Sequence, residues 1–254
     1  MSSAHCTSAL RSDTRPCWGC QGHRLVKLHV RPTPGWPCKR NCFSLQLVGR
    51  RSYTKRYKAQ HRAIVPTVMV LTESTPFEIG TKAPAFQLPE PVTGKIRTLE
   101  EISEGASATL VMFICNHCPF VKLLKEGMVN LAKDYQSRGL ATVAISSNSV
   151  KTHPQDGPEE MAADAQAFGY PFPYLYDETQ EVAKAYRALC TPEFMVFDSK
   201  LELQYHGQFD SARPSKDVSV TGEDLRAALD DILAGKPVQK PIKPSVGCSI
   251  KWHP

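Results

Sequence analysis

The chain has 254 residues with 31 Lys and Arg, 25 Asp and Glu, and a formal net charge of +6. Residues 1–72 hold 13 of the bases and a single acid, a net +12, so the rest of the chain carries −6. An acidic body argues against a nucleic-acid surface, and no apolar run approaches the ~18 residues of a spanning helix, so we expect neither nucleic acid nor a membrane as a partner.

The first 66 residues are rich in Arg, poor in acids and interrupted by prolines, with no sustained apolar period. This composition is typical of an organelle transit peptide, so we predict that residues 1–66 are disordered and removed after import. An alternative is a zinc module, because four cysteines here have the spacing C-x2-C-x17-C-x3-C, which is close to a zinc ribbon. They are Cys17, Cys20, Cys38 and Cys42.

From Ile79 onward the sequence alternates between strand and helix patterns. A turn inside residues 80–99 predicts a hairpin, and the continuous apolar runs 109–114 and 140–145 predict strands that are buried on both faces. Between these two strands, apolar residues spaced by three and four over 120–135 predict an amphipathic helix.

The second half of the body continues the pattern. Asp156 as a cap, with Pro158 in the first turn, predicts a helix that runs to Gly169. The remaining expected elements are a short helix over 177–186, strands over 194–197 and 201–206, and a last helix over 221–233.

This order of elements indicates an α/β fold. Buried strands that alternate with helices imply a parallel core, and the closing pair of strands adds antiparallel edges. We therefore predict one domain over residues 67–235, followed by a Pro- and Lys-rich C-terminal tail over residues 236–254.

The strongest functional signal is the segment Cys115-Asn116-His117-Cys118, between a buried strand and a helix. Free N–H groups and the dipole at a helix start stabilise a thiolate, and the neighbouring imidazole of His117 adds to this. We expect a lowered pKa for Cys115, which acts as the nucleophile, and an ordinary one for Cys118, which resolves the mixed disulfide. The redox group is then the Cys115–Cys118 disulfide itself, with no other cofactor and no metal. Two buried structural cysteines, or a metal-binding C-x-x-C, are the alternatives.

Residues 79–235 resemble the thioredoxin superfamily, most closely its peroxiredoxin-like and TlpA-like branch. The resemblance rests on the entry 80–88, on the strand that ends in Cys-x-x-Cys, and on Thr191-Pro192 before a later strand. With residues 146–157 and the tail 246–252, the chain is also similar to uncharacterised plastid thioredoxin-like proteins of plants and algae. The resemblance implies a thioredoxin fold, with a central mixed β-sheet flanked by helices and an N-terminal β-hairpin.

The resemblance also assigns roles. It implies that the Thr191–Pro192 bond is cis and faces the Cys pair, and that the backbone of Thr191 binds an extended substrate segment. Peroxiredoxins carry a threonine where this chain has Met112, and an arginine where it has Thr191. Both groups polarise a peroxide, so these departures argue against efficient peroxide reduction.

Four further residues are candidates for supporting roles. Asn148 and His153 either line the active-site cleft or are ordinary polar loop residues. Cys190 and Cys248 are candidate accessory thiols, although a buried cysteine is commonly just a small apolar side chain.

Three functions follow from these observations. The leading one is an antioxidant thiol–disulfide oxidoreductase, which acts on protein or small-molecule disulfides and uses a reductant such as thioredoxin or glutathione. The second is a peroxiredoxin-like thiol peroxidase that consumes peroxides. The third is a non-enzymatic module that binds a metal or a partner. The resemblance favours the chloroplast, whereas Arg50-Arg51-Ser52-Tyr53 would equally suit a mitochondrial presequence.

Overall fold

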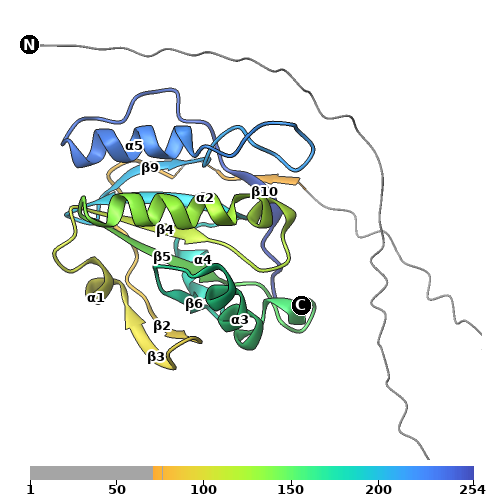
Figure 1. Cartoon of the computed structure of the whole chain (residues 1–254). Coiled ribbons are helices and arrows are strands. Elements are labelled where there is room, and N and C mark those ends of the chain that lie inside the picture. The colour runs from red at the N-terminus through yellow and green to blue at the C-terminus, as the bar shows by residue number, and fades with distance from the viewer. Residues whose placement is uncertain (1–70, 76) are drawn as a thin grey trace, which may run out of the picture. The chain divides into compact units, whose positions relative to one another are not determined.

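A five-stranded sheet forms the centre of the molecule, in the order β6-β5-β4-β8-β9 (Figure 1). The three strands β4, β5 and β6 are mutually parallel, and β8 and β9 are antiparallel to their neighbours, as the alternation of elements predicted. The bounds are β4 Ala108–Phe113, β5 Leu140–Ser146, β6 Tyr174–Tyr176, β8 Glu193–Asp198 and β9 Leu203–Gly207.

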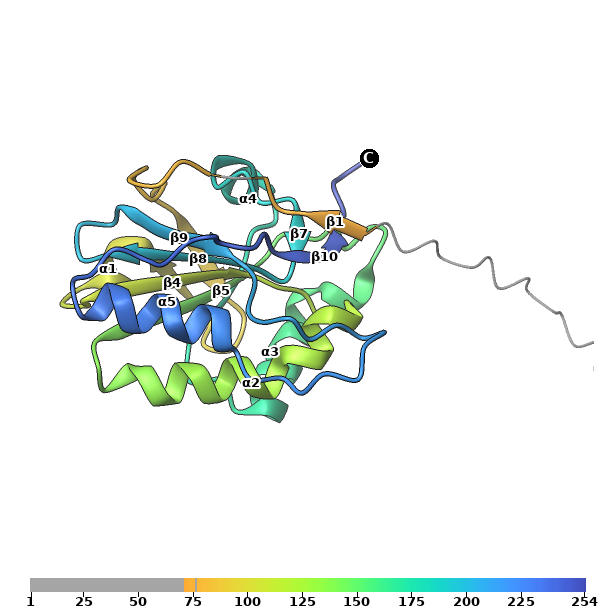
Figure 2. The ribbon, with the colours of Figure 1, turned by 90° about the horizontal axis from the view of Figure 1, so that it is seen from above.

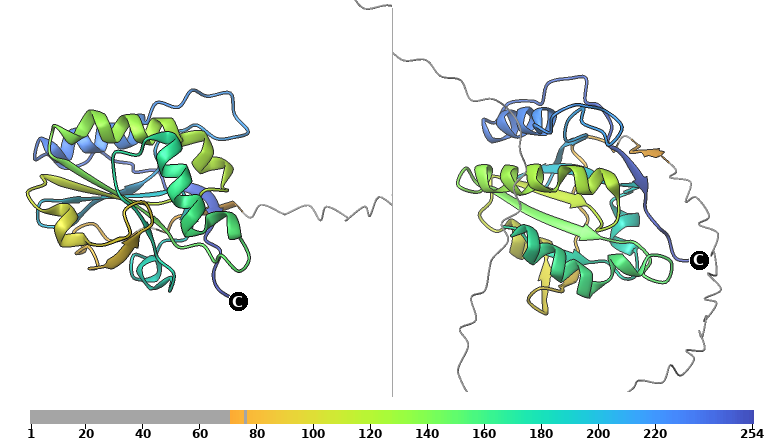
Figure 3. Two further views of the ribbon diagram at one scale, coloured as in Figure 1. Left: turned by 60° about the horizontal axis from the view of Figure 1, so that its bottom comes forward. Right: turned by 45° about the vertical axis from the view of Figure 1, so that its right-hand side comes forward.

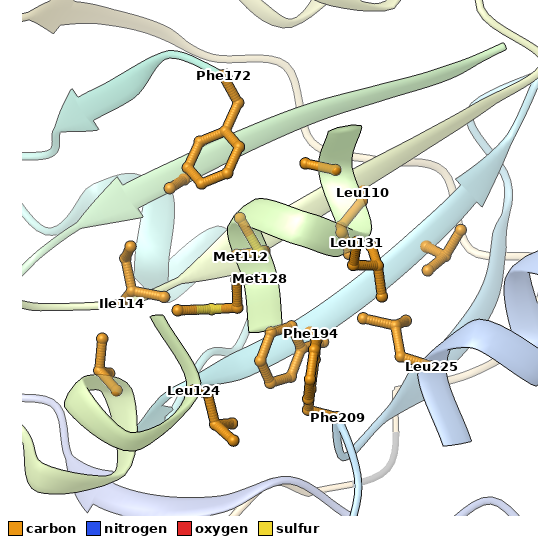
Figure 4. Close-up of a cluster of buried hydrophobic side chains, with 14 of the residues drawn as sticks. Leu110, Met112, Ile114, Leu124, Met128, Leu131, Phe172, Phe194, Phe209 and Leu225 are labelled. Atoms are coloured by element: carbon orange, nitrogen blue, oxygen red, sulfur yellow. The ribbon is translucent and has the colours of Figure 1, made fainter. Parts of the chain in front are cut away.

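Helices cover both faces of this sheet, because alternate residues of each strand point to opposite sides. In β4, Leu110 and Met112 belong to one apolar cluster, together with residues of α2, α3 and α5 (Figures 2 and 4). Val111 and Phe113 belong to the second cluster, with residues of α1 and α4. The bounds are α1 Leu99–Ser103, α2 Pro119–Gln136, α3 Pro158–Phe168, α4 Glu181–Ala185 and α5 Glu223–Leu233, with a 3₁₀ turn η1 at Pro154–Asp156.

The N-terminal hairpin consists of β2 (Gln87–Glu90) and β3 (Lys95–Thr98), which pair antiparallel. Phe86 and Leu88 from this region join the second apolar cluster, beside Leu99 of α1. The mixed sheet, the flanking helices and the hairpin confirm the thioredoxin fold that the sequence predicted.

A second, three-stranded sheet has the order β1-β10-β7 and lies beside the start of α2 (Figures 2 and 3). Its strands are β1 (Leu71–Glu73), β10 (Val246–Ser249) and β7 (Cys190–Thr191). The prediction that residues 236–254 form a tail outside the domain is therefore wrong. The segment around β10 is rich in proline and lysine, which do not indicate a strand. The strands that pair with β10 lie more than fifty residues away in sequence.

The computed structural model describes residues 71–75 and 77–254. The predicted transit peptide and the four cysteines of the alternative zinc module lie outside these residues. Within them, no helix combines the length and the apolar character that crossing a membrane requires.

Candidate active site

The Cys-x-x-Cys segment connects β4 to α2. Strand β4 ends at Phe113 and the helix begins at Pro119, so Cys118 is the N-cap residue and Cys115 precedes the helix altogether. Both thiols are buried. Residue 118, rather than residue 115, therefore stands where the helix dipole favours a thiolate.

The side chain of Asp156 makes hydrogen bonds to the loop between the two cysteines. Its Oδ1 accepts the backbone N–H groups of Asn116 at 2.9 Å and His117 at 3.1 Å. Its Oδ2 lies 2.5 Å from Nδ1 of His117 and accepts the side-chain amide of Asn148 at 2.9 Å. Burial alone would raise the pKa of Asp156, but these hydrogen bonds outweigh it and lower that pKa. A buried, ionised carboxylate thus lies beside Cys115.

The surroundings of the pair change its expected titration. Burial raises the pKa of Cys115 most, and the neighbouring Cys118 and the charge of Asp156 add to this. The neighbouring thiols of Cys115 and Cys248 lower the pKa of Cys118. The predicted lowering at Cys115 alone is therefore wrong, chiefly because that thiol is buried.

The structure also places the other predicted residues around the pair. Sγ of Cys115 lies 3.7 Å from Nδ1 of His117 and 3.4 Å from Oγ1 of Thr191. Sγ of Cys118 lies 3.1 Å from the carbonyl oxygen of Thr191. The Thr191–Pro192 bond is cis, which confirms that prediction.

The loop after β5 carries Asn148 and His153, for which the sequence left open a place at the cleft or an ordinary polar loop position. The ring of His153 stacks on the ring of His117 at a centroid distance of 4.7 Å, and Asn148 holds Asp156. Burial and the neighbouring His117 lower the pKa of His153. These contacts show two loop side chains that support the Cys-x-x-Cys segment.

Two predictions for this region need correction. Asp156 was expected to cap α3, but the N-cap is Gly157, and the carboxylate turns instead to residues forty positions earlier. The backbone of Thr191 was expected to pair with a substrate, but it already pairs with Cys248 of β10. An extended substrate could pair there only if β10 moved away.

The two candidate accessory thiols differ in what they touch. Sγ of Cys248 lies 2.8 Å from Sγ of Cys118, inside the site. Sγ of Cys190 faces the carboxylate of Glu193 at 3.5 Å and the carbonyl of Ser245 at 3.9 Å. Of these two thiols, only that of Cys248 contacts a cysteine of the Cys-x-x-Cys segment.

Cys115, His117 and Asp156 also offer one sulfur, one nitrogen and one oxygen within 4.8 Å of one another, a set that could hold a metal ion. A structural zinc site takes four ligands. Both oxygens of Asp156 already accept hydrogen bonds, so a metal would have to displace the contacts that order this loop. The arrangement fits thiol chemistry better than metal binding.

Residues 79–206 match the AhpC/TSA family. An uncharacterized conserved protein from Geobacillus kaustophilus is 52% identical with a TM-score of 0.71, over 73% of this chain and 98% of that chain. A hypothetical protein from Sinorhizobium meliloti is 48% identical with a TM-score of 0.70, over 72% of this chain and 98% of that chain. No curated protein sequence matches this chain. The chain belongs to the AhpC/TSA family and has the thioredoxin fold.

Proposed function

We propose that this protein is a thiol–disulfide oxidoreductase whose redox couple is Cys115–Cys118. The placement of the two cysteines carries the proposal: Cys118 is the N-cap residue of α2, where the helix dipole stabilises a thiolate, and Cys115 precedes the helix beside His117 and Thr191. A stabilised thiolate favours the reduced form of a couple and makes its disulfide a stronger oxidant.

Cys115 is the proposed point of contact with substrate. Its sulfur lies 3.7 Å from the ring of His117, which is partly exposed, whereas the sulfur of Cys118 faces Cys248 and the carbonyl of Thr191. Cys115 passes its proton to the Cys118 thiolate as it attacks a substrate disulfide, so that a mixed disulfide forms and one substrate thiolate departs. That thiolate takes the proton from Cys118, which then attacks the mixed disulfide and releases the second product. A thiol reductant such as thioredoxin or glutathione then restores the pair.

The substrates are small-molecule disulfides, or protein disulfides at exposed sites. This restriction follows from β10, which occupies the pairing position beside Thr191. We further propose that residues 1–66 direct the chain to the chloroplast, or alternatively to the mitochondrion, and are removed there.

A thiol peroxidase is the second candidate, because the hydroxyl of Thr191 lies 3.4 Å from Sγ of Cys115 and could donate to a peroxide. Met112 argues against it. Its side chain packs in the apolar cluster with Met128 and Phe194 (Figure 4) and offers no hydroxyl at the position where peroxiredoxins carry threonine.

A trapping experiment tests the redox proposal. Cys118→Ser should accumulate a mixed disulfide through Cys115 with a disulfide substrate, and Cys115→Ser should form no such adduct. Wild type should catalyse the reduction of insulin disulfides by dithiothreitol, and Cys190→Ser should catalyse it at the wild-type rate. Trapping by Cys115→Ser alone would reverse the two roles. Rapid peroxide consumption without any trapping would favour the peroxidase.

A further inference from the structure

Strand β10 delivers Cys248 to the Cys pair. In the antiparallel ladder of β10 and β7, Cys248 is directly opposite Thr191, and directly opposed residues present their side chains on the same face. The side chain of Thr191 faces Cys115, at 3.4 Å from its sulfur. The register alone therefore directs Cys248 toward the site.

The sulfur distances agree with this register. Sγ of Cys248 lies 2.8 Å from Sγ of Cys118. A disulfide bond is about 2.05 Å long, so the two sulfurs need to approach by only about 0.8 Å to bond. Cys118 thus has Cys248 as a contacting thiol, in addition to Cys115 three residues earlier in the chain.

Gly247 allows β10 to lie this close. A Cβ atom at position 247 would stand 2.0 Å from the carbonyl oxygen of Thr191 and 2.6 Å from its carbonyl carbon. Any other residue would push the strand away from β7. A glycine next to Cys248 therefore holds the thiol at the site.

We propose that Cys248 is a third redox thiol, which exchanges with the Cys115–Cys118 disulfide to form a Cys118–Cys248 disulfide. The inference rests on the proposed function, since it requires that the Cys pair becomes oxidised during turnover. The inference gives a chemical role to β10, which the sequence alone indicates only as part of a polar C-terminal tail.

The exchange is balanced without an added oxidant or reductant. The Cys248 thiolate attacks Sγ of Cys118, the Cys118–Cys248 bond forms, and the Cys115–Cys118 bond breaks. The electron pair of the broken bond leaves on Cys115, which takes up the proton that Cys248 has lost. One disulfide is present before and after, and Cys115 becomes a free thiol again.

The charge distribution supports the timing of this step. In the reduced protein the pKa of Cys248 is raised, first by its hydrogen bond to Cys118 and then by burial, while Lys251 lowers it. Once Cys118 is part of a disulfide, its thiolate no longer exists and the largest cause of that shift is removed. Cys248 therefore becomes a better nucleophile when the Cys115–Cys118 disulfide forms.

The exchange also changes which thiol faces the substrate. In the Cys115–Cys118 form the substrate-facing sulfur is blocked, whereas in the Cys118–Cys248 form Cys115 is free. The protein can then engage a second molecule while it still holds one disulfide. The new bond would also link β10 to the N-cap residue of α2.

Disulfide mapping in the full chain tests the inference. Cys115→Ser removes the first partner of Cys118, so stoichiometric diamide should convert Cys118 and Cys248 into one disulfide, detected by mass spectrometry of unreduced peptides. The matched control, Cys115→Ser with Cys190→Ser, should give the same yield, because Cys190 faces Glu193. Cys115→Ser with Cys248→Ser should leave Cys118 unpaired. Free Cys118 and Cys248 in oxidised, folded Cys115→Ser would overturn the inference.

A second measurement separates this inference from the proposed function. In oxidised wild type, both the Cys115–Cys118 and the Cys118–Cys248 disulfides should be found, whereas Cys248→Ser should contain only the first. If wild type shows only the Cys115–Cys118 disulfide and catalyses the reduction of insulin by dithiothreitol, the inference fails and the proposed function stands. If wild type forms neither disulfide, both fail.

Discussion

Cys190 and Cys248 lie in neighbouring, hydrogen-bonded strands and both are buried, yet their surroundings assign them opposite roles. Cys190 is one residue before Thr191 and therefore points to the other face of β7, where Glu193 and Ser245 enclose it. Cys248 is opposite Thr191 and meets Cys118. Strand register, rather than burial, therefore separates Cys248, the proposed redox thiol, from Cys190.

The largest loss of stability is expected from a substitution of Glu193, which lies beside Cys190. The buried carboxylate of Glu193 accepts the N–H groups of Leu189 at 2.9 Å and Cys190 at 3.0 Å, and it lies 2.7 Å from Nε2 of His206. Glu193→Ala leaves these groups without a partner, so the free energy of unfolding should fall by about 3–5 kcal/mol. Urea unfolding measures the change.

Glu193→Gln is the matched control, because it keeps an acceptor for the two N–H groups and should lose less stability. An unfolding free energy that is unchanged in Glu193→Ala would mean that the Cys190 side is not a structural element, and the contrast with Cys248 would be lost.

A smaller effect is expected in the strand that holds Cys248. In Gly247→Ala the new methyl group collides with the carbonyl of Thr191, so the unfolding free energy should fall by about 1–3 kcal/mol. The yield of the Cys118–Cys248 disulfide should fall as well, while the Cys115–Cys118 disulfide still forms. Ser249→Ala, in the same strand, should change neither yield. Equal yields in Gly247→Ala and wild type would show that close packing of β10 is not needed.

The smallest effect is expected on the pKa of Cys118. Since the hydrogen bond from Cys248 lowers the pKa of Cys118, Cys248→Ala should raise that pKa by about one pH unit, the equivalent of ~1.4 kcal/mol. Thiolate absorbance should then disappear at a higher pH as the reduced protein is acidified. Cys190→Ala should titrate as wild type does, and a shift of equal size there would remove the distinction between the two thiols.

The sequence predicts well where neighbouring residues determine the structure. The strands 109–114 and 140–145 and the helix 120–135 have clear periodicity, and the structure places β4, β5 and α2 there. The Cys pair at the junction of strand and helix follows from the same pattern.

The sequence fails where the partner is distant in the chain. Asp156 followed by Gly157 and Pro158 resembles a local helix cap, but its carboxylate binds N–H groups at positions 116 and 117. Likewise, nothing near Cys248 indicates that its strand pairs with residues 190–191. Such contacts depend on tertiary folding, which the local pattern does not encode.

The contact between Asp156 and the Cys115 loop bears on damage by excess oxidant. A cysteine that proceeds to the sulfinic or sulfonic acid carries a permanent negative charge, and these products are generally irreversible. At Cys115 that charge would be buried near the Asp156 carboxylate, whose Oδ1 already takes the N–H groups of Asn116 and His117. The same aspartate that contributes to the raised pKa of Cys115 would thereby disfavour over-oxidation of this thiol to the irreversible acids.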